Sequence, residues 1–135
     1  IARISPLLPV IGSGSGKLQP IWVEDVARCF VKALDVSETF GQTYEMGGDA
    51  AYSIKEIMRL LLRAMGKRRI LAHMPVSVAR FKARLFDYMP MKPPFTEDQI
   101  IMLGEDNVCD PAPIKSAFGL SPRPMADYLN EQFGK

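Results

Sequence analysis

Tyr88 and Lys92 are the two residues of this chain whose types and spacing fit proton-transfer chemistry. They could act together if both stood on one face of a helix, where the lysine ammonium would lower the pKa of the tyrosine phenol. Pro90 lies between them, and proline removes a backbone donor and breaks a helix interior. We therefore predict that the spacing is coincidental and that the chain supplies no catalytic residue of its own.

The glycine-rich segment 12–17 has a composition that invites comparison with a phosphate-binding loop. Its letters are GSGSGK, so the glycines stand too close together and Leu18 occupies the place where a P-loop has serine or threonine. A dinucleotide-binding turn also needs a helix directly after it, whereas Gln19 and Pro20 introduce a predicted strand. The pattern predicts a flexible surface loop and no cofactor-binding residue.

Metal ligands and nucleophiles are scarce. His73 is the only histidine, so this chain alone cannot assemble a histidine-based metal cluster or triad. A strand histidine with a local hydrogen bond is the favoured interpretation. Cys29 and Cys109 lie too far apart in sequence to indicate a disulfide framework or a metal site. We expect two reduced, structural thiols and assign no metal ligand.

The overall composition is that of an ordinary globular piece. Hydrophobic residues make up 47% of the 135 residues, charged residues 24%, and the formal net charge is +2. So small a charge gives no general argument for a nucleic-acid partner. No apolar run approaches the roughly 20 residues that span a bilayer, and residues 1–4 do not resemble a signal peptide. We expect no transmembrane segment.

Hydrophobic periodicity predicts a strand at 21–23 that runs into a helix beginning near Glu24. Glu24 and Asp25 place acids at the helix N-terminus, where they complement the helix dipole. Trp22 is predicted to be a core aromatic. One helical face should be buried, because at 100° per residue it gathers the apolar side chains. These are Val26, Ala27, Phe30, Val31 and Leu34.

A second helix is predicted after Ser53, which forms a Ser-x-x-Glu capping box with Glu56, and Gly66 should end that helix. Thr96 and Gln99 repeat the pattern before a short helix that Gly104 ends. The remaining predictions are strands at 43–46 and 70–74, and helices at 75–88, 112–118 and 125–132.

Several of these segments resemble the C-terminal part of extended short-chain dehydrogenase/reductase (SDR) proteins. The resemblance is greatest to the SDR-like accessory subunit of respiratory complex I (NADH:ubiquinone oxidoreductase) and its bacterial relatives. It covers nearly all of the chain. It is carried by PVIG at 9–12, QPIWVEDVA at 19–27, GQTYEMGG at 41–48, YSIKEI at 52–57, PPFTEDQI at 93–100 and DNV at 106–108.

The resemblance implies an α/β fold: the helix-rich, substrate-side portion of an extended SDR Rossmann-type fold with a few short strands. Residues 1–135 would form the C-terminal lobe, and the N-terminal dinucleotide-binding half would be absent from the chain. NAD(P) would then belong to the full-length protein, with none bound by this chain alone. Asp25 would have the structural role that this acid has at the lobe junction of extended SDRs.

Two functions follow from the resemblance. The first is an accessory or assembly subunit of complex I, peripheral to the inner membrane on the cytoplasmic side, or on the matrix side in a eukaryote. The alternative is the substrate domain of an active SDR-type NAD(P)-dependent oxidoreductase or epimerase. In both cases the missing N-terminal half would be a partner of this chain. In the first case complex I subunits would be partners as well. The wide apolar faces also predict self-association of the chain alone.

Candidate residues for a pocket or a docking surface come from two places. Lys82 projects from the apolar side of the helix predicted at 75–88, where it must snorkel, pair, or line a cavity. With it we group Phe81, Leu85 and Phe86. Lys17 and Gln19 precede the first predicted strand, where nucleotide-sugar enzymes of this family commonly carry a basic residue that holds phosphate. Gln19 and Leu18 stand there instead, which weakens the epimerase alternative.

Overall fold

The computed structural model of the chain describes residues 6–87 and 101–134, with residues 82–87 as backbone alone. The chain divides into two compact units. Unit 1 comprises Ile1–Lys17 and Ser53–Asp106, and unit 2 comprises Leu18–Tyr52 and Asn107–Lys135. Two short strands, β2 (Lys17–Leu18) and β3 (Tyr52–Ser53), lie where the chain passes from one unit to the other. The predicted α/β class is confirmed.

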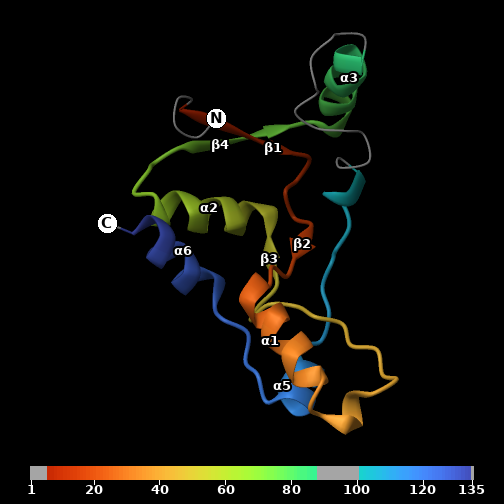
Figure 1. Cartoon of the computed structure of the whole chain (residues 1–135). Helices are drawn as coiled ribbons and strands as arrows, with labels where there is room; N and C mark the ends of the chain where they lie inside the picture. Colours follow the sequence, from red (N-terminus) through yellow and green to blue (C-terminus); the bar gives the residue numbers. More distant parts are fainter. Residues whose placement is uncertain (1–5, 88–100, 135) are drawn as a thin grey trace. The chain divides into compact units, whose positions relative to one another are not determined.

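Unit 1 is built around a two-stranded parallel sheet. Strand β1 (Leu7–Ile11) pairs with β4 (Ile70–Met74), with Leu7 opposite Ile70 and Ile11 opposite Met74 (Figure 1). Parallel strands need a long crossover connection, and α2 (Ile54–Ala64) lies within it. Helix α3 (Val76–Asp87) follows β4 directly. The strand predicted at 70–74 is confirmed, and the helix predicted at 75–88 is confirmed within one residue at each end.

Helix α2 forms where the capping box predicts it. The Ser53 hydroxyl accepts from Glu56 N (3.3 Å), and the Glu56 carboxylate accepts from Ser53 N (2.7 Å). Gly66, at φ 61°, takes the left-handed conformation that closes the helix. A small apolar cluster forms around Ile11 and Ala79, which are 8% and 4% exposed.

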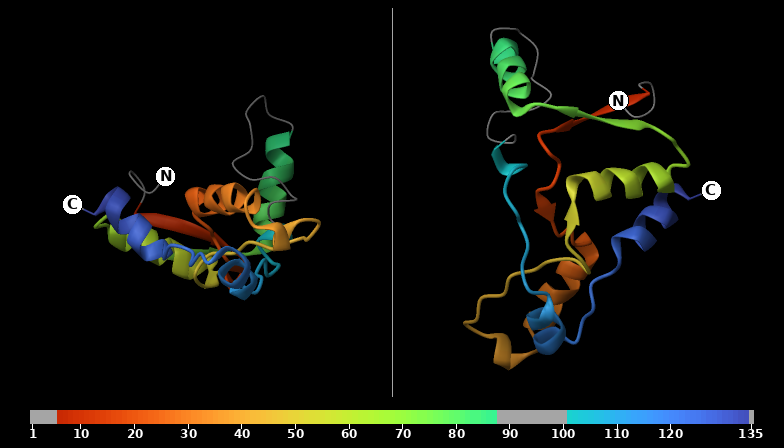
Figure 2. Two further views of the ribbon diagram at one scale, coloured as in Figure 1. Left: turned by 60° about the horizontal axis from the view of Figure 1, so that its bottom comes forward. Right: turned by 180° about the vertical axis from the view of Figure 1, so that it is seen from behind.

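Unit 2 packs helices against extended segments. Helix α1 (Val23–Ala33) is followed by the short 3₁₀ helix η1 (Ser37–Thr39), and α5 (Ala112–Phe118) and α6 (Met125–Phe133) complete the unit. Helix α5 lies against α1 (Figures 1 and 2). The core is formed by Cys29, Ile114 and Phe118, with the Tyr44 ring edge-on to Phe118 at 5.1 Å. The predictions at 112–118 and 125–132 are confirmed.

Two predicted strands in unit 2 are wrong. Residues 21–22 are extended but unpaired, Val23 already opens α1, and no strand forms at 43–46. Both segments have β-forming side chains, but a strand also needs a partner to complete its hydrogen-bond ladder. Gly48 N donates to Gln19 O (3.2 Å), yet no ladder continues from that bond in the described part of the chain.

The apolar face that the sequence predicts for α1 is present, but unit 2 does not cover it. The helix turns Asp25 and Cys29 inward, at 5% and 1% exposure. Phe30 is 68% exposed and Leu34 77% exposed. The physical reason is that α5 packs on the opposite side of α1, so the apolar row predicted from the sequence faces away from the core of unit 2.

Candidate functional site

Gln19 connects three segments of unit 2 through its side-chain amide. Its Nε2 donates to Gly48 O (2.9 Å), and its Oε1 accepts from Cys109 N (2.9 Å). The Gln19 backbone carbonyl accepts from Gly48 N. Both ends of the amide are therefore used inside the protein, so Gln19 is a structural clamp whose hydrogen bonds hold the surrounding walls together.

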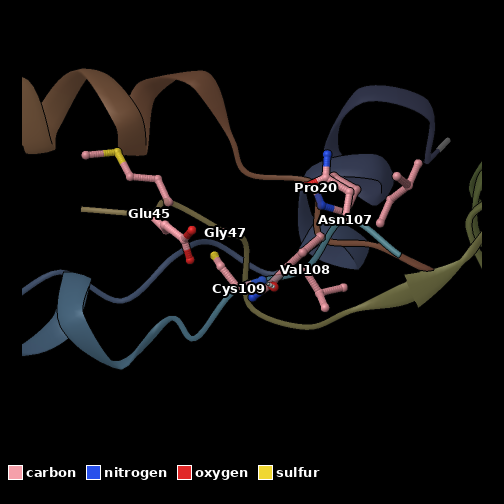
Figure 3. Close-up of a pocket in the computed structure, with 9 residues that line it drawn as sticks. Pro20, Glu45, Gly47, Asn107, Val108 and Cys109 are labelled. Atoms are coloured by element: carbon pink, nitrogen blue, oxygen red, sulfur yellow. Dashed lines mark hydrogen bonds between the residues drawn. The ribbon is translucent and has the colours of Figure 1, made fainter. Parts of the chain in front are cut away.

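A pocket of about 540 Å³ lies beside this clamp (Figure 3). Gly47 is essential to its shape, because a side chain there would run into both the Gln19 amide and the Cys109 sulfur. The pocket is formed by three segments that are far apart in sequence. Its lining residues are Leu18, Gln19, Pro20, Glu45, Met46, Gly47, Asn107, Val108 and Cys109.

The chemistry of this pocket favours binding over covalent catalysis. Burial is the main cause that raises the pKa of the Cys109 thiol, and the nearby carboxylates of Glu45 and Asp110 raise it further. A thiol with a raised pKa stays protonated and is a poor nucleophile. Among the described residues, no three histidine, cysteine or acidic side chains gather closely enough to hold a metal ion. The pocket is lined by the carboxylate of Glu45, the amide of Asn107 and several apolar side chains.

Asp25 joins two segments of unit 2 through its carboxylate. One carboxylate oxygen accepts from Arg123 N (2.7 Å) and the other lies 3.5 Å from Arg28 Nη1. The guanidinium carbons of Arg123 and Arg28 lie 4.7 and 5.6 Å from the centroid of the Trp22 ring. Trp22 is therefore a partly exposed cation–π partner and not the core aromatic that the sequence predicted. The group ties the start of α1 to the segment before α6.

The glycine-rich loop at 12–17 caps a helix. Gly14 O accepts from Lys55 N (3.3 Å), and Gly16 O accepts from Ile54 N (3.1 Å). A phosphate loop must instead direct backbone N–H groups at the ligand. Here the loop's own carbonyls satisfy the first donors of α2, so the loop fixes the start of that helix.

The residues predicted for a pocket or docking surface belong to both units. Gln19 lies in the pocket of unit 2. Lys17 belongs to unit 1, where it is exposed and its N–H donates to Asp106 (2.8 Å). Phe81 is 69% exposed on α3. The side chains of Lys82, Leu85 and Phe86 lie outside the described residues, as do Tyr88, Lys92, Thr96 and Gln99.

Sequence reasoning missed the far wall of the pocket. Asn107, Val108 and Cys109 reach it from about 90 positions along the chain, through the bond between Cys109 N and Gln19 Oε1. The only sequence signal for this wall is the DNV segment at 106–108, which is part of the family resemblance. No local periodicity could have paired it with Gln19.

The exposed side of α1 forms a second candidate site, which we call the α1 stripe. It consists of Val23, Ala27, Phe30, Val31 and Leu34. Its four large members are between 63% and 77% exposed. At 100° per residue the stripe covers about 100° of the helix, the width with which a helix usually faces a core. The α1 stripe is an apolar surface without a partner among the described residues.

Comparison with known proteins identifies two relatives in sequence. Over 89 residues the chain is 35% identical to the mitochondrial NADH dehydrogenase [ubiquinone] 1 alpha subcomplex subunit 9 of Arabidopsis thaliana. Over 119 residues it is 28% identical to the photosystem II assembly factor Ycf39 of Synechocystis. These alignments cover 65% and 83% of this chain, but only 22% and 36% of the relatives. No family model matches.

Solved structures share the fold over nearly the whole chain. The Escherichia coli NADPH-dependent quinone oxidoreductase in complex with NADPH is 21% identical, with a TM-score of 0.64, and covers 93% of this chain. The triphenylmethane reductase of Citrobacter is 17% identical, with a TM-score of 0.67 and 94% coverage. A nucleoside-diphosphate-sugar epimerase of Staphylococcus aureus is 21% identical, with a TM-score of 0.61 and 90% coverage.

This chain spans between 43% and 45% of those three structures. Within the described part of the chain, none of the helices combines the length and the apolar composition that crossing a bilayer requires. The resemblance found in the sequence is confirmed: the chain is related to SDR-like proteins that include an NADH dehydrogenase subunit and a photosystem assembly factor, and it has the fold of part of an NAD(P)-linked reductase or epimerase.

Proposed function

We propose that this chain is the C-terminal lobe of an NAD(P)-binding SDR-like accessory or assembly subunit of NADH:ubiquinone oxidoreductase. In this proposal the N-terminal half of the full-length protein holds the nucleotide, and the present chain packs against it and offers a surface to complex I subunits. The sequence relatives support the accessory or assembly role, since one is an NADH dehydrogenase subunit and the other an assembly factor.

The α1 stripe is the observation that carries the proposal. The core of unit 2 leaves the large side chains of the α1 stripe exposed to water. A partner that covers the α1 stripe would bury Phe30, Val31 and Leu34. Burying the four large side chains of the α1 stripe would stabilise a complex by on the order of 5 kcal/mol. A helix face of this width and composition is typical of one that packs on a sheet or another helix.

The extended segment 43–46 supports the same conclusion. Its side chains alternate in the manner of a strand: Tyr44 and Met46 are partly buried against the core of unit 2, and Thr43 and Glu45 are exposed. It lies in unit 2, as α1 does. A segment with strand-type alternation but no ladder is suited to join a sheet supplied by another body. The nucleotide-binding half of the full-length protein is the body we propose.

Cofactor and location follow from the same proposal. Two of the structural neighbours carry NADP(H) or NADPH in their solved complexes, which supports NAD(P) as the ligand of the full-length protein. The present chain would bind none alone. The name of the mitochondrial relative supports a mitochondrial location in a eukaryote. We propose in addition a position peripheral to the inner membrane, on the matrix side in a eukaryote and on the cytoplasmic side in a bacterium.

The test is affinity purification of the tagged full-length protein from its source, followed by native electrophoresis and identification of its partners. Co-migration with NADH dehydrogenase subunits is expected. The pair Phe30→Ser and Leu34→Ser should reduce this association, because both substitutions remove apolar surface from the α1 stripe. Phe81→Ser, at an equally exposed phenylalanine in unit 1, is the matched control. Recovery of the wild-type protein free of these subunits would contradict the proposal.

The pocket beside Gln19 favours a second candidate function. Its volume of about 540 Å³ falls within the range of small-molecule sites. In this alternative the chain is the substrate domain of an active NAD(P)-dependent oxidoreductase or epimerase. The test is NADPH-dependent reduction of a quinone by the full-length protein. Turnover that falls when Gly47→Val fills the pocket, while folding is retained, would favour the enzyme over the accessory subunit.

Self-association of the chain alone follows from the same exposed surface. Because the α1 stripe has no partner among the described residues, the α1 stripe of one copy should bury against another copy when no complex I subunit is present. We expect sedimentation to show a concentration-dependent dimer or larger species. Phe30→Ser should shift it toward the monomer. A wild-type chain that remains monomeric at high concentration would argue against the α1 stripe as a contact surface.

A further inference from the structure

The near-neutral total charge conceals two units of opposite sign. Unit 1 contains twelve lysines and arginines against six aspartates and glutamates, a net charge of +6. Unit 2 contains five against nine, a net charge of −4. Such a difference between the parts of one chain indicates that the basic part faces an anionic partner. The partner of unit 1 is therefore expected to differ in charge from that of unit 2.

Helix α3 of unit 1 has one face that packs on the unit and another that is exposed. Ala79 is buried in the small apolar cluster with Ile11. On another side of the helix Val78 is 42% exposed and Phe81 is 69% exposed. Arg80 is exposed as well, but it falls roughly 130° from the centre of that side. The cluster with Ile11 thus anchors α3 to unit 1 and leaves an apolar row turned away from it.

The helical period extends this row and flanks it with cations. At 100° per residue, position 85 (leucine) falls between Val78 and Phe81 on the helix surface. Positions 82 (lysine) and 84 (arginine) fall on opposite sides of the row, roughly 70° and 90° from its centre. An apolar row with a cation on each flank is typical of a helix that lies in the plane of a membrane surface.

We propose that α3 docks unit 1 on a bilayer rich in anionic phospholipid. The apolar row centred on Phe81 would enter the boundary between headgroups and acyl chains. The flanking cations would keep their charges at the level of the phosphates, since lysine and arginine stems can lie along apolar surface while their heads stay in water. Each lysine or arginine near such a surface strengthens binding about fivefold.

Charge and shape together favour lipid over other anionic partners. A nucleic acid would use the cations of unit 1 through its phosphates and would gain little from an exposed row of valine, phenylalanine and leucine. An anionic bilayer would bind both the cations of unit 1, through its headgroups, and the apolar row, through its acyl chains. The short length of α3, 12 residues, also suits a helix that lies on a membrane and does not cross it.

The experiment is flotation of the full 135-residue chain with vesicles of phosphatidylcholine alone or of phosphatidylcholine with phosphatidylglycerol. Binding is expected to the anionic vesicles and to weaken strongly between about 0.1 M and about 1 M salt, where the screening length falls from about 10 Å to about 3 Å. Phe81→Ser should lower the partition coefficient about tenfold. Lys82→Gln, on a flank of the row, should lower it about fivefold and reduce its salt dependence. Arg80→Gln, roughly 130° from the centre of the row, should change it little.

Phe30→Ser is the matched control, because Phe30 is 68% exposed on the acidic unit 2 and Phe81 is 69% exposed on the basic unit 1. Circular dichroism of each variant verifies folding. The inference is overturned if Phe30→Ser lowers vesicle binding as much as Phe81→Ser does, if phosphatidylcholine alone binds equally well, or if no vesicle binds.

The inference is independent of the accessory role. If the chain binds vesicles but its full-length parent has no NADH dehydrogenase partner, the membrane-docking role of α3 is supported and the accessory-subunit proposal is refuted. Co-purification with those subunits in the absence of vesicle binding would do the reverse.

Discussion

Replacing Asp25 by alanine should destabilise unit 2 by about 3 kcal/mol. Asp25 is 5% exposed, and its carboxylate accepts the backbone N–H of Arg123 at 2.7 Å. A hydrogen bond to a charged acceptor contributes about 1.5–3 kcal/mol, and its loss leaves a buried donor without a partner. The acid also complements the positive end of α1, which adds about 0.5 kcal/mol.

Two further variants separate these contributions. Asp25→Asn keeps an acceptor for Arg123 N and removes only the charge, so about 1 kcal/mol should be lost. Glu24→Ala removes the neighbouring, exposed acid of the same first turn, so only the interaction with the helix end is lost, under about 1 kcal/mol. The expected order of destabilisation is Asp25→Ala first, then Asp25→Asn, then Glu24→Ala.

Urea unfolding followed by the fluorescence of Trp22 measures this order. Trp22 is the only tryptophan, it lies in unit 2, and its ring contacts Arg123 and Arg28. With a slope of about 1–3 kcal/mol per molar urea, the midpoint of Asp25→Ala should fall by at least about 1 M. An Asp25→Ala midpoint no lower than that of Glu24→Ala would refute the claim that the bond to Arg123 N organises the unit.

Three other outcomes can be measured on the same chain. Hydrogen bonds from the Ser53 N–H and hydroxyl hold the pKa of Glu56 below its ordinary value of 4.5. This stabilisation is complete above that value and is lost as the pH falls through the lower folded pKa, so Glu56→Gln, which removes the titrating group, should flatten the acid side of the stability curve in thermal unfolding. Gly48→Ala should cost about 3 kcal/mol by overlap with the Pro20 carbonyl, against about 1 kcal/mol for Gly41→Ala, which meets open space at φ 72°. Because burial raises the pKa of the Cys109 thiol, its alkylation by iodoacetamide should begin at a higher pH than that of free cysteine; equal onset would contradict this.

Local signals in the sequence predicted those elements whose hydrogen bonds close within themselves. The capping box of Ser53 and Glu56 fixed the start of α2, and Gly66 fixed its end. The helix at 112–118 was predicted to the residue. Within these helices the backbone donors and acceptors find partners about four positions away, so neighbouring residues contain most of the signal, although Ile54 N and Lys55 N bond to the distant carbonyls of Gly16 and Gly14.

The strand at 70–74 was predicted, but two other predicted strands and the uncovered face of α1 show the limit of local signals. The segments 21–23 and 43–46 have β-forming side chains, but a strand exists only where a second strand completes its ladder. Periodicity also identified the apolar row on α1 as a face to be buried, but it did not identify what covers that face, because a period tells only which side chains share a face.

The sequence by itself determined the α/β class, the helix boundaries and the family resemblance, because these depend on residues close together in the chain. Only the tertiary structure decided that Cys109 N bonds to Gln19 and that Arg123 N bonds to Asp25. It also decided that Phe30 is exposed and Cys29 buried. Contacts across 90 or more positions depend on how α5 and the segment before α6 return to α1, and no local pattern encodes that return.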